Sequence, residues 1–126
     1  MNQLKDSGER REFASGSVRD QSVGKGRFDL LPPEALKGLA IQMELGAAKY
    51  SARNWELGQP ICRSYLDSAL RHLMQVLEGK TDEDHLRAAL WNVACAYTTR
   101  ERVANGRLPK ELDDIPKPLI QIEPGH

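Results

Sequence analysis

Apolar residues recur at helical spacing in three stretches of the chain. The first stretch follows Pro32 and Pro33, which suit a helix start, and Glu34 complements the positive end of the helix dipole. Its apolar positions repeat every three or four residues, at Leu36, Leu39, Ala40, Met43 and Ala47. This pattern predicts a first helix, followed by a loop over 51–60 in which Gly58 and Pro60 act as helix breakers.

Two further helices are predicted after this loop. The second begins at Ser64, where Ser64 and Asp67 resemble a capping box, and it ends at Gly79. The third begins at Thr81, and Asn105-Gly106 ends it. Their apolar stripes consist of Leu66, Ala69, Leu70, Leu73, Val76 and Leu77 in the second helix, and of Leu86, Leu90, Val93 and Tyr97 in the third. Nothing between the helices has the pattern of a strand, so the predicted fold class is all-α.

The two ends of the chain differ from this helical region. Residues 1–24 are polar and are predicted to form a flexible arm before a single domain over 25–106. Residues 107–126 contain four prolines and are predicted to form an extended tail, in which 119–122 lie against the body or a partner subunit. Three striped helices are few for a self-sufficient core, so we expect copies to pair through helix faces as a homodimer or homotetramer.

Composition and charge narrow the function classes. Eighteen basic and eighteen acidic residues give a formal net charge of zero, which argues against general nucleic-acid binding. No apolar run approaches the ~20 residues of a membrane span, and the N-terminus has no apolar signal-peptide core. Cys62 and Cys95 lack metal-type spacing and are expected to be buried free thiols in a reducing compartment, which favours the cytoplasm.

The first helix and its loop offer the first candidate site residues. Glu44 lies beside the apolar stripe, where a carboxylate can enter a groove between helices and bind a divalent metal; the alternative is an exposed surface residue. Downstream, cations, aromatic rings and an amide are concentrated in one short run, which consists of Lys49, Tyr50, Arg53, Asn54 and Trp55. Lysine and arginine bind phosphate, and an aromatic ring stacks on a base, although Trp55 alone is typical of a core residue.

The second and third helices offer further polar residues. Arg71 either binds a ligand or pairs only with Asp67 at i,i+4, and His72 alone is typical of a satisfied core histidine. The turn before the third helix places Asp84 and His85 together as an oxygen ligand and a titratable nitrogen, with Asn92 on the same face as His85. Asp82 and Glu83 are interpreted as helix caps. Because the chain has no glycine-rich phosphate loop, phosphate chemistry would rely on metal and side-chain cations.

Four stretches together carry a family resemblance: Lys25 to Pro32, including Arg27 and Asp29; Gly46 to Trp55; Arg71-His72; and the acidic turn with His85 and Asn92. They resemble the phage and bacterial dATP/dGTP diphosphohydrolases, a branch of the MazG-like all-α nucleoside triphosphate pyrophosphatases that includes the phage MazZ proteins.

The resemblance implies a MazG-like helical bundle that hydrolyses dGTP or dATP to the monophosphate and pyrophosphate with Mg²⁺ or Mn²⁺. In phages such an activity supplies diaminopurine DNA synthesis. Glu44 fits the first acid of the superfamily's E-x-x-E helix, but Ala47 stands at the second, and His85 and Ala88 stand where a second acidic pair is expected. The expected metal ligands and catalytic residues are therefore Glu44, Asp84 and His85, with Asp67 or Glu78 as further acids, or else catalysis is weak.

The residues that are expected to bind substrate are Arg27, Asp29, Lys49, Tyr50, Arg53, Asn54, Trp55, Arg71, His72 and Asn92. Three alternatives stay open. One is a non-catalytic module that binds purine nucleotides, and another is a structural helical interaction protein. The third is a metal phosphohydrolase of the HD type that uses His72, Asp84 and His85.

Overall fold

The computed structural model describes residues 6–118, and the chain divides into two compact units, Met1–Pro32 and Pro33–His126. The first unit contains an antiparallel hairpin in which β1 (Arg10–Glu12) pairs with β2 (Val18–Asp20). Gly16 has a φ of +91° in the turn, a conformation that favours glycine and lets the chain reverse. The sequence predicted a flexible arm here without regular structure, and the hairpin is therefore an addition to that expectation.

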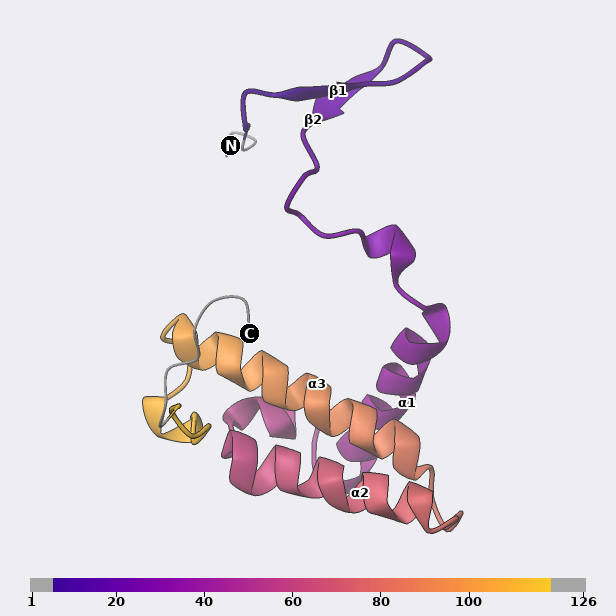
Figure 1. The fold of residues 1–126 in the computed structure, drawn as a ribbon, viewed down its shortest axis with the longest axis vertical. Helices are drawn as coiled ribbons and strands as arrows, with labels where there is room; N and C mark the ends of the chain where they lie inside the picture. The colour runs from indigo at the N-terminus through magenta and orange to yellow at the C-terminus, as the bar shows by residue number, and fades with distance from the viewer. Residues whose placement is uncertain (1–5, 119–126) are drawn as a thin grey trace. The chain divides into compact units, whose positions relative to one another are not determined.

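The second unit is built from three helices, α1 (Pro33–Lys49), α2 (Asp67–Leu77) and α3 (His85–Ala104), as Figure 1 shows. The longest of them, α3, packs against both α1 and α2. A 3₁₀ turn, η2 (Asn54–Leu57), and a π-helix, η3 (Ile61–Leu66), connect α1 to α2. The predicted all-α fold is confirmed, and in the described part of the chain no helix is long and apolar enough to cross a membrane.

The second and third helices begin at positions that differ from the sequence prediction. Helix α3 begins at His85, with Asp84 as its cap, and not at Thr81. The π-helix η3 extends the second helical segment back to Ile61, so Ser64 lies inside it and is not its cap. Instead Asp114 accepts hydrogen bonds from the backbone N–H groups of Cys62 (2.6 Å) and Arg63 (3.1 Å). These bonds lower the pKa of Asp114 and fasten the chain after η4 (Lys110–Leu112) to the start of η3. The rest of the predicted tail contact, 119–122, lies outside the described residues.

The core lies where η3 crosses the second half of α3. Ile61 and Tyr65 are buried against Cys95 and Ala96, and Met43, Trp55, Leu66 and Trp91 pack around them. The Tyr65 hydroxyl donates to the backbone carbonyl of Trp55 at 2.9 Å, which ties the loop after α1 to the core. Both cysteines are free, as expected, but only Cys95 is fully buried, whereas Cys62, at the start of η3, is half-buried.

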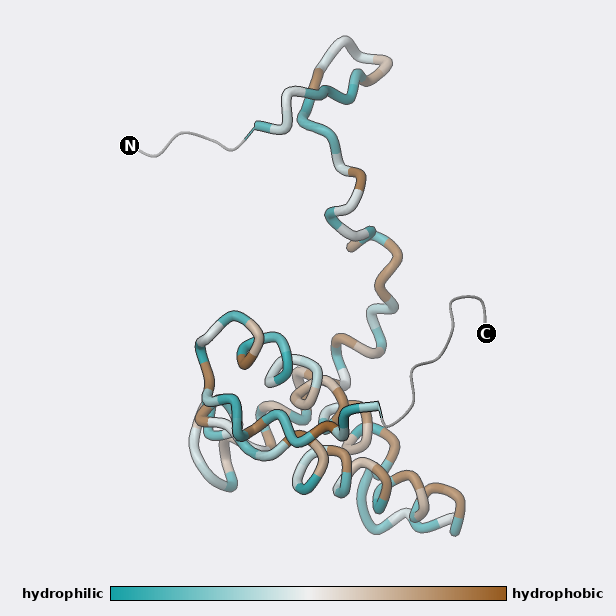
Figure 2. Tube along the Cα trace, turned by 60° about the vertical axis from the view of Figure 1, so that its left-hand side comes forward, coloured by the Kyte–Doolittle hydropathy of each residue, from teal (hydrophilic) through white to brown (hydrophobic). Residues whose placement is uncertain are grey.

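Small and polar residues form the buried face of α3. Its members are His85, Ala88, Ala89, Asn92, Cys95, Ala96 and Thr99. The apolar stripe that periodicity identifies in this helix lies on another face and is exposed. Figure 2 accordingly shows apolar segments recurring along the helices, interleaved with polar ones. Small residues on the buried face let α2 approach α3 closely, so the larger aliphatic side chains point elsewhere.

Candidate functional site

A polar groove of about 900 Å³ is the main candidate site. Side chains from the second half of α1, the loop after it, η3, α2 and α3 line the groove. Three cations, Lys49, Arg63 and Arg71, face it together with the carboxylates of Asp67 and Glu83. The lining also includes amide, imidazole and indole groups, from Gln42, Asn54, Gln59, His72, Trp91 and Asn92. Such a mixture suits an anionic ligand that is held by several cations and oriented by hydrogen bonds.

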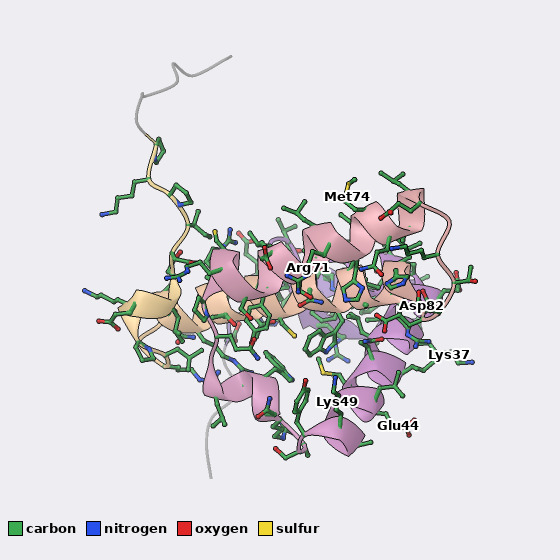
Figure 3. The ribbon with its side chains drawn as sticks, turned by 90° about the horizontal axis from the view of Figure 1, so that it is seen from below. Lys37, Glu44, Lys49, Arg71, Met74 and Asp82 are labelled. Carbon is green, nitrogen blue, oxygen red and sulfur yellow. The ribbon has the colours of Figure 1, made fainter. Side chains whose placement is uncertain are left out.

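Helix geometry explains why the cations of η3 and α2 lie together. Arg63, Asp67 and Arg71 follow one another at intervals of four residues, and side chains so spaced share a helix face. Arg71 forms an ion pair with Asp67, and both side chains stay more than half exposed. Lys49 comes from the last turn of α1, and Figure 3 labels it together with Arg71 of α2. The groove therefore collects charge from two separate helices.

A histidine cluster, formed by His72, Glu83 and His85, adjoins the groove. The Nδ1 atoms of His72 and His85 lie 2.9 Å apart. The Glu83 carboxylate is 3.3 Å from His72 Nδ1 and 3.5 Å from His85 Nδ1. One ligand atom from each of the three residues lies within 4.8 Å of the others, and His85 is almost completely buried. Two imidazole nitrogens and a carboxylate at this spacing are a donor set for a divalent transition metal.

The acidic turn before α3 orients the cluster. His85 Nε2 lies 2.7 Å from Asp82 Oδ1, so an N–H on Nε2 leaves the Nδ1 lone pair facing His72 and Glu83. The bond to His85 lowers the pKa of Asp82, which favours the charged carboxylate. Asp84, by contrast, caps α3 by accepting from the backbone N–H of Arg87 at 3.0 Å. The structure thus exchanges the expected roles in this turn: Asp84 caps, and Glu83 and Asp82 contact the histidines.

An aromatic cavity of about 510 Å³ adjoins the polar groove. Met43, Trp55 and Trp91 give it apolar walls, and its remaining lining includes polar groups from the loop after α1. Tyr50, Asn54 and Gln59 line both the cavity and the groove. Trp55 also packs against the core and lies under the guanidinium of Arg102, whose Cζ is 5.4 Å from the ring centroid. The Trp55 ring therefore packs against the core, as tryptophan rings usually do, and it also lines the cavity.

Glu44 and Arg53 are not placed where the sequence analysis expected them. Both line the aromatic cavity, whereas Lys49 and the histidine cluster adjoin the groove. Figure 3 shows the Glu44 side chain on the outer side of α1. Helix α1 ends at Lys49, and Arg53 has a φ of +63° with its guanidinium 2.9 Å from Glu56. The turn after α1 thus separates Arg53 from Lys49, and the two do not converge on one hollow.

The remaining expected residues have ordinary local partners. Arg27 and Asp29 belong to the first unit and form a two-pronged ion pair with each other at 2.8 Å. Asn92 is buried, lines the groove and donates to the backbone carbonyl of Ala88 at 2.9 Å. The exposed Tyr50 lies beside Lys49, with Nζ 5.2 Å from the ring centroid.

Sequence reasoning missed several residues of the site. Arg63 extends the Asp67–Arg71 pattern backward by four residues, which is a signal that the sequence contains. Glu83 carried no such signal, because three consecutive acids before a helix are typical of caps and only the turn geometry selects among them. Gln59 and Trp91 come from the loop and from α3, and only the tertiary structure brings them together.

Comparison with models of protein families gave a match. A family model described as dATP/dGTP diphosphohydrolase, N-terminal, matches residues 15–107, which include α1, α2, α3 and every groove residue named above. Comparison with curated proteins and with solved structures gave no match. Since the family match covers most of the chain, the chain belongs to the dATP/dGTP diphosphohydrolase family.

Proposed function

We propose that the chain hydrolyses dATP or dGTP to the monophosphate and pyrophosphate in the polar groove, with a divalent metal ion in the histidine cluster. The observation that carries the proposal is the continuity of three features. The cations of the groove, the histidine cluster and the aromatic cavity adjoin one another, and Tyr50 and Asn54 line both hollows. Together they form one site with an apolar part for a purine and a polar, cationic part for a sugar and a triphosphate.

The two hollows suit opposite ends of the nucleotide. The walls of the aromatic cavity suit a flat purine ring, for which Asn54 and Gln59 offer hydrogen bonds to the base edge. Lys49, Arg63 and Arg71 in the groove offset the negative charge of the phosphates. With the base in the cavity, the triphosphate extends along the groove towards the histidine cluster.

The residues of the cluster fit a metal ion. Two imidazole nitrogens with one carboxylate favour Mn²⁺ or another transition metal over Mg²⁺, which prefers oxygen ligands and retained water. A bound ion would neutralise charge that develops on phosphate oxygens. Asp82 holds the His85 ring in place, and Lys49 and Arg71 offset the charge on the leaving pyrophosphate.

Hydrolysis itself requires few further groups. Water adds to the α-phosphorus, the bond from that phosphorus to the bridging α–β oxygen breaks, and pyrophosphate leaves. The water must also lose a proton, and the Asp67 carboxylate, which lines the groove outside the histidine cluster, offers an acceptor.

A nucleotide panel tests the reaction. dGTP, dATP, dCTP and dTTP are incubated with the protein and either Mn²⁺ or Mg²⁺, and the products are resolved by chromatography. We expect purine monophosphate and pyrophosphate in equal amounts, with faster turnover in Mn²⁺. Nucleotide binding without any product would overturn the proposal in favour of a non-catalytic binding module.

Two lysines of α1 provide a matched pair for the phosphate contacts. Lys49 lines the groove, whereas Lys37 is exposed near the start of the same helix (Figure 3). We expect Lys49→Ala to weaken dGTP binding tenfold to hundredfold, the loss of about 1.5–3 kcal/mol for one charge-assisted contact. The loss for dGMP should be smaller, and Lys37→Ala should change neither affinity. Calorimetry with both nucleotides measures this, and equal losses for the two lysines would remove Lys49 from the site.

Two glutamates provide the corresponding pair for the metal. Glu83→Gln removes the only carboxylate of the His72–Glu83–His85 cluster, whereas Glu44→Gln changes a carboxylate on the outer side of α1 (Figure 3). We expect Mn²⁺ binding, measured by calorimetry without nucleotide, to be lost in Glu83→Gln and kept in Glu44→Gln. The opposite result would return the metal to the E-x-x-E position of α1.

A second candidate reaction uses the same cluster. The close pair of His72 and His85 also suits a metal phosphohydrolase that releases the whole triphosphate and leaves the nucleoside. The product analysis distinguishes the two reactions, since inorganic triphosphate and a nucleoside would appear in place of pyrophosphate and monophosphate.

A further inference from the structure

The segment that follows α3 contacts the loop that lines both hollows at two separate points. We refer to residues 108–114 as the C-terminal segment and to residues 58–63, which include the start of η3, as the site loop. Figure 1 shows the C-terminal segment, with η4 in it, beside the end of α3. In the site loop, Gln59 lines both the aromatic cavity and the polar groove, and Arg63 lines the groove.

The first contact is made at Gly58. Its φ of +103° lies in the region that favours glycine, and a Cβ placed on it would lie 2.5 Å from Leu112 Cδ1 and 3.4 Å from Leu108 Cδ2. Both leucines are half-buried, whereas the neighbouring Leu57 is 80% exposed. The leucines of the C-terminal segment therefore pack directly onto the backbone of the site loop, an approach that only a residue without a side chain permits.

The second contact is the carboxylate of Asp114 at the start of η3. It accepts from the backbone N–H of Cys62 at 2.6 Å and from that of Arg63 at 3.1 Å. The first N–H groups of a helix have no partners within the helix, so a carboxylate in this place fixes the course of the chain where the helix begins. Arg63 is thus held through its own backbone, and Gln59 lies between the two contacts.

The C-terminal segment is itself fixed to α3. The backbone carbonyl of Arg102 accepts from the N–H groups of Arg107 at 2.8 Å and Leu108 at 3.1 Å. The guanidinium of the same arginine lies 2.9 Å from Glu56 and over the ring of Trp55, just before the site loop. The segment therefore links a long helix of the unit to the loop that carries two residues of the candidate site.

We propose that Asp114 is a positioning residue for substrate: through the backbone of Arg63 it holds that guanidinium towards the phosphates in the polar groove. Asp114 is not among the residues that line either hollow, so its effect passes through the site loop. A long side chain with a fixed backbone loses less freedom when it binds a ligand, which favours affinity. This role rests on the proposed function, in which Arg63 is one of three cations that meet the triphosphate.

The test compares two neighbouring aspartates. Asp114→Ala removes the carboxylate that holds the site loop, whereas Asp113→Ala removes the same charge from an exposed residue that accepts from the N–H of Ile115 at 3.2 Å. We expect Asp114→Ala to raise KM for dGTP about tenfold and to change kcat by less than about twofold, because binding rather than the chemical step is affected. Asp113→Ala should match the wild-type protein.

Asp114→Asn separates the position of the loop from the fold of the protein. Asparagine keeps one oxygen that accepts from one of the two N–H groups, so KM should lie between those of the wild-type protein and Asp114→Ala. Amide hydrogen exchange of Cys62 and Arg63, followed by NMR without nucleotide, should accelerate in the same order while the helical circular dichroism is kept. This variant carries the same comparison if the alanine variant does not fold.

The outcomes keep the two proposals apart. A wild-type protein that neither binds nor hydrolyses dGTP would overturn the proposed function, and the role of Asp114 with it. An active wild-type protein in which Asp114→Ala accelerates amide exchange but leaves KM unchanged would overturn the positioning role alone. Equal rises of KM in Asp113→Ala and Asp114→Ala would do the same, since loss of one negative charge would then explain the effect.

Discussion

The two halves of α3 bury different kinds of residue. Near its start, His85 and Asn92 are buried beside the groove, and His85 contacts side chains from α2 and from the acidic turn. Near its end, Cys95 and Ala96 pack against Ile61 and Tyr65. The single polar residue buried there, Thr99, donates to the carbonyl of Cys95 in its own helix at 2.8 Å. Asn92 likewise donates within α3, to the carbonyl of Ala88, so the difference between the halves lies in His85, whose ring needs partners from outside the helix.

The second half of α3 therefore contributes mainly to folding stability, and the first half mainly to the candidate site. Contacts in the second half remove apolar surface from water, which is the main favourable contribution to folding. Contacts in the first half hold polar atoms in a fixed geometry, which contributes less to stability and more to ligand selection. We expect substitutions in the two halves to have different consequences.

The largest effect is expected from Ile61→Ala in the core. Ile61 is 1% exposed, and its truncation leaves a cavity beside Tyr65 and Cys95. The free energy of unfolding should fall by about 3 kcal/mol, with metal binding retained in the folded protein. His85→Gln should lower it by only about 1 kcal/mol while abolishing metal binding. Urea titrations with calorimetry measure both quantities, and equal destabilisation by the two variants would erase the distinction between the halves.

A smaller effect is expected from Asp82→Asn. The substitution weakens the hydrogen bond that orients His85, so Mn²⁺ affinity should fall about tenfold while the fold is kept. Asp84→Asn is the matched control, because it removes the same charge two residues away and asparagine still caps α3. If both variants lost the same affinity, loss of negative charge alone would explain the effect, and Asp82 would not be a positioning residue.

The core half is also expected to respond to alkaline pH. Burial raises the pKa of Cys95 and of Tyr65 to about 12. The unfolded chain releases these protons nearer its ordinary pKa values of 9.0 and 10.0, so between about pH 9 and 12 it binds fewer protons than the folded protein. The free energy of unfolding therefore falls as the pH rises through this range, by up to about 1.4 kcal/mol per pH unit for each group.

Cys95→Ala isolates the contribution of the thiol. Chemical denaturation at pH 8, 9 and 10 should show a shallower decline in this variant than in the wild-type protein. Identical declines would mean that the Cys95 thiol titrates alike in the folded and unfolded states.

Much of the fold follows from local pattern. The start of α1 at Pro33, the end of α2 before Gly79 and the end of α3 before Asn105 all follow from helix-start and helix-stop residues. The start of α2 did not, since the residues that satisfy the N–H groups of η3 include Asp114, fifty-two residues beyond Cys62. A cap so distant in the chain leaves no local signal. The hairpin of the first unit was also missed, because two three-residue strands in which Val18 is the single apolar residue lack apolar alternation.

The candidate site divides in the same way. The sequence by itself determined the three helices, the family and the residue types of the site, because periodicity, caps and short motifs are local properties. Only the tertiary structure decided that Glu83 rather than Asp84 faces the histidines and that Arg53 turns away from Lys49. It also decided that α3 buries its small face and exposes its leucines. Each of these outcomes depends on the direction of a side chain at a turn or on the distance between two helices. Neither can be predicted from the spacing of residues within one helix or turn.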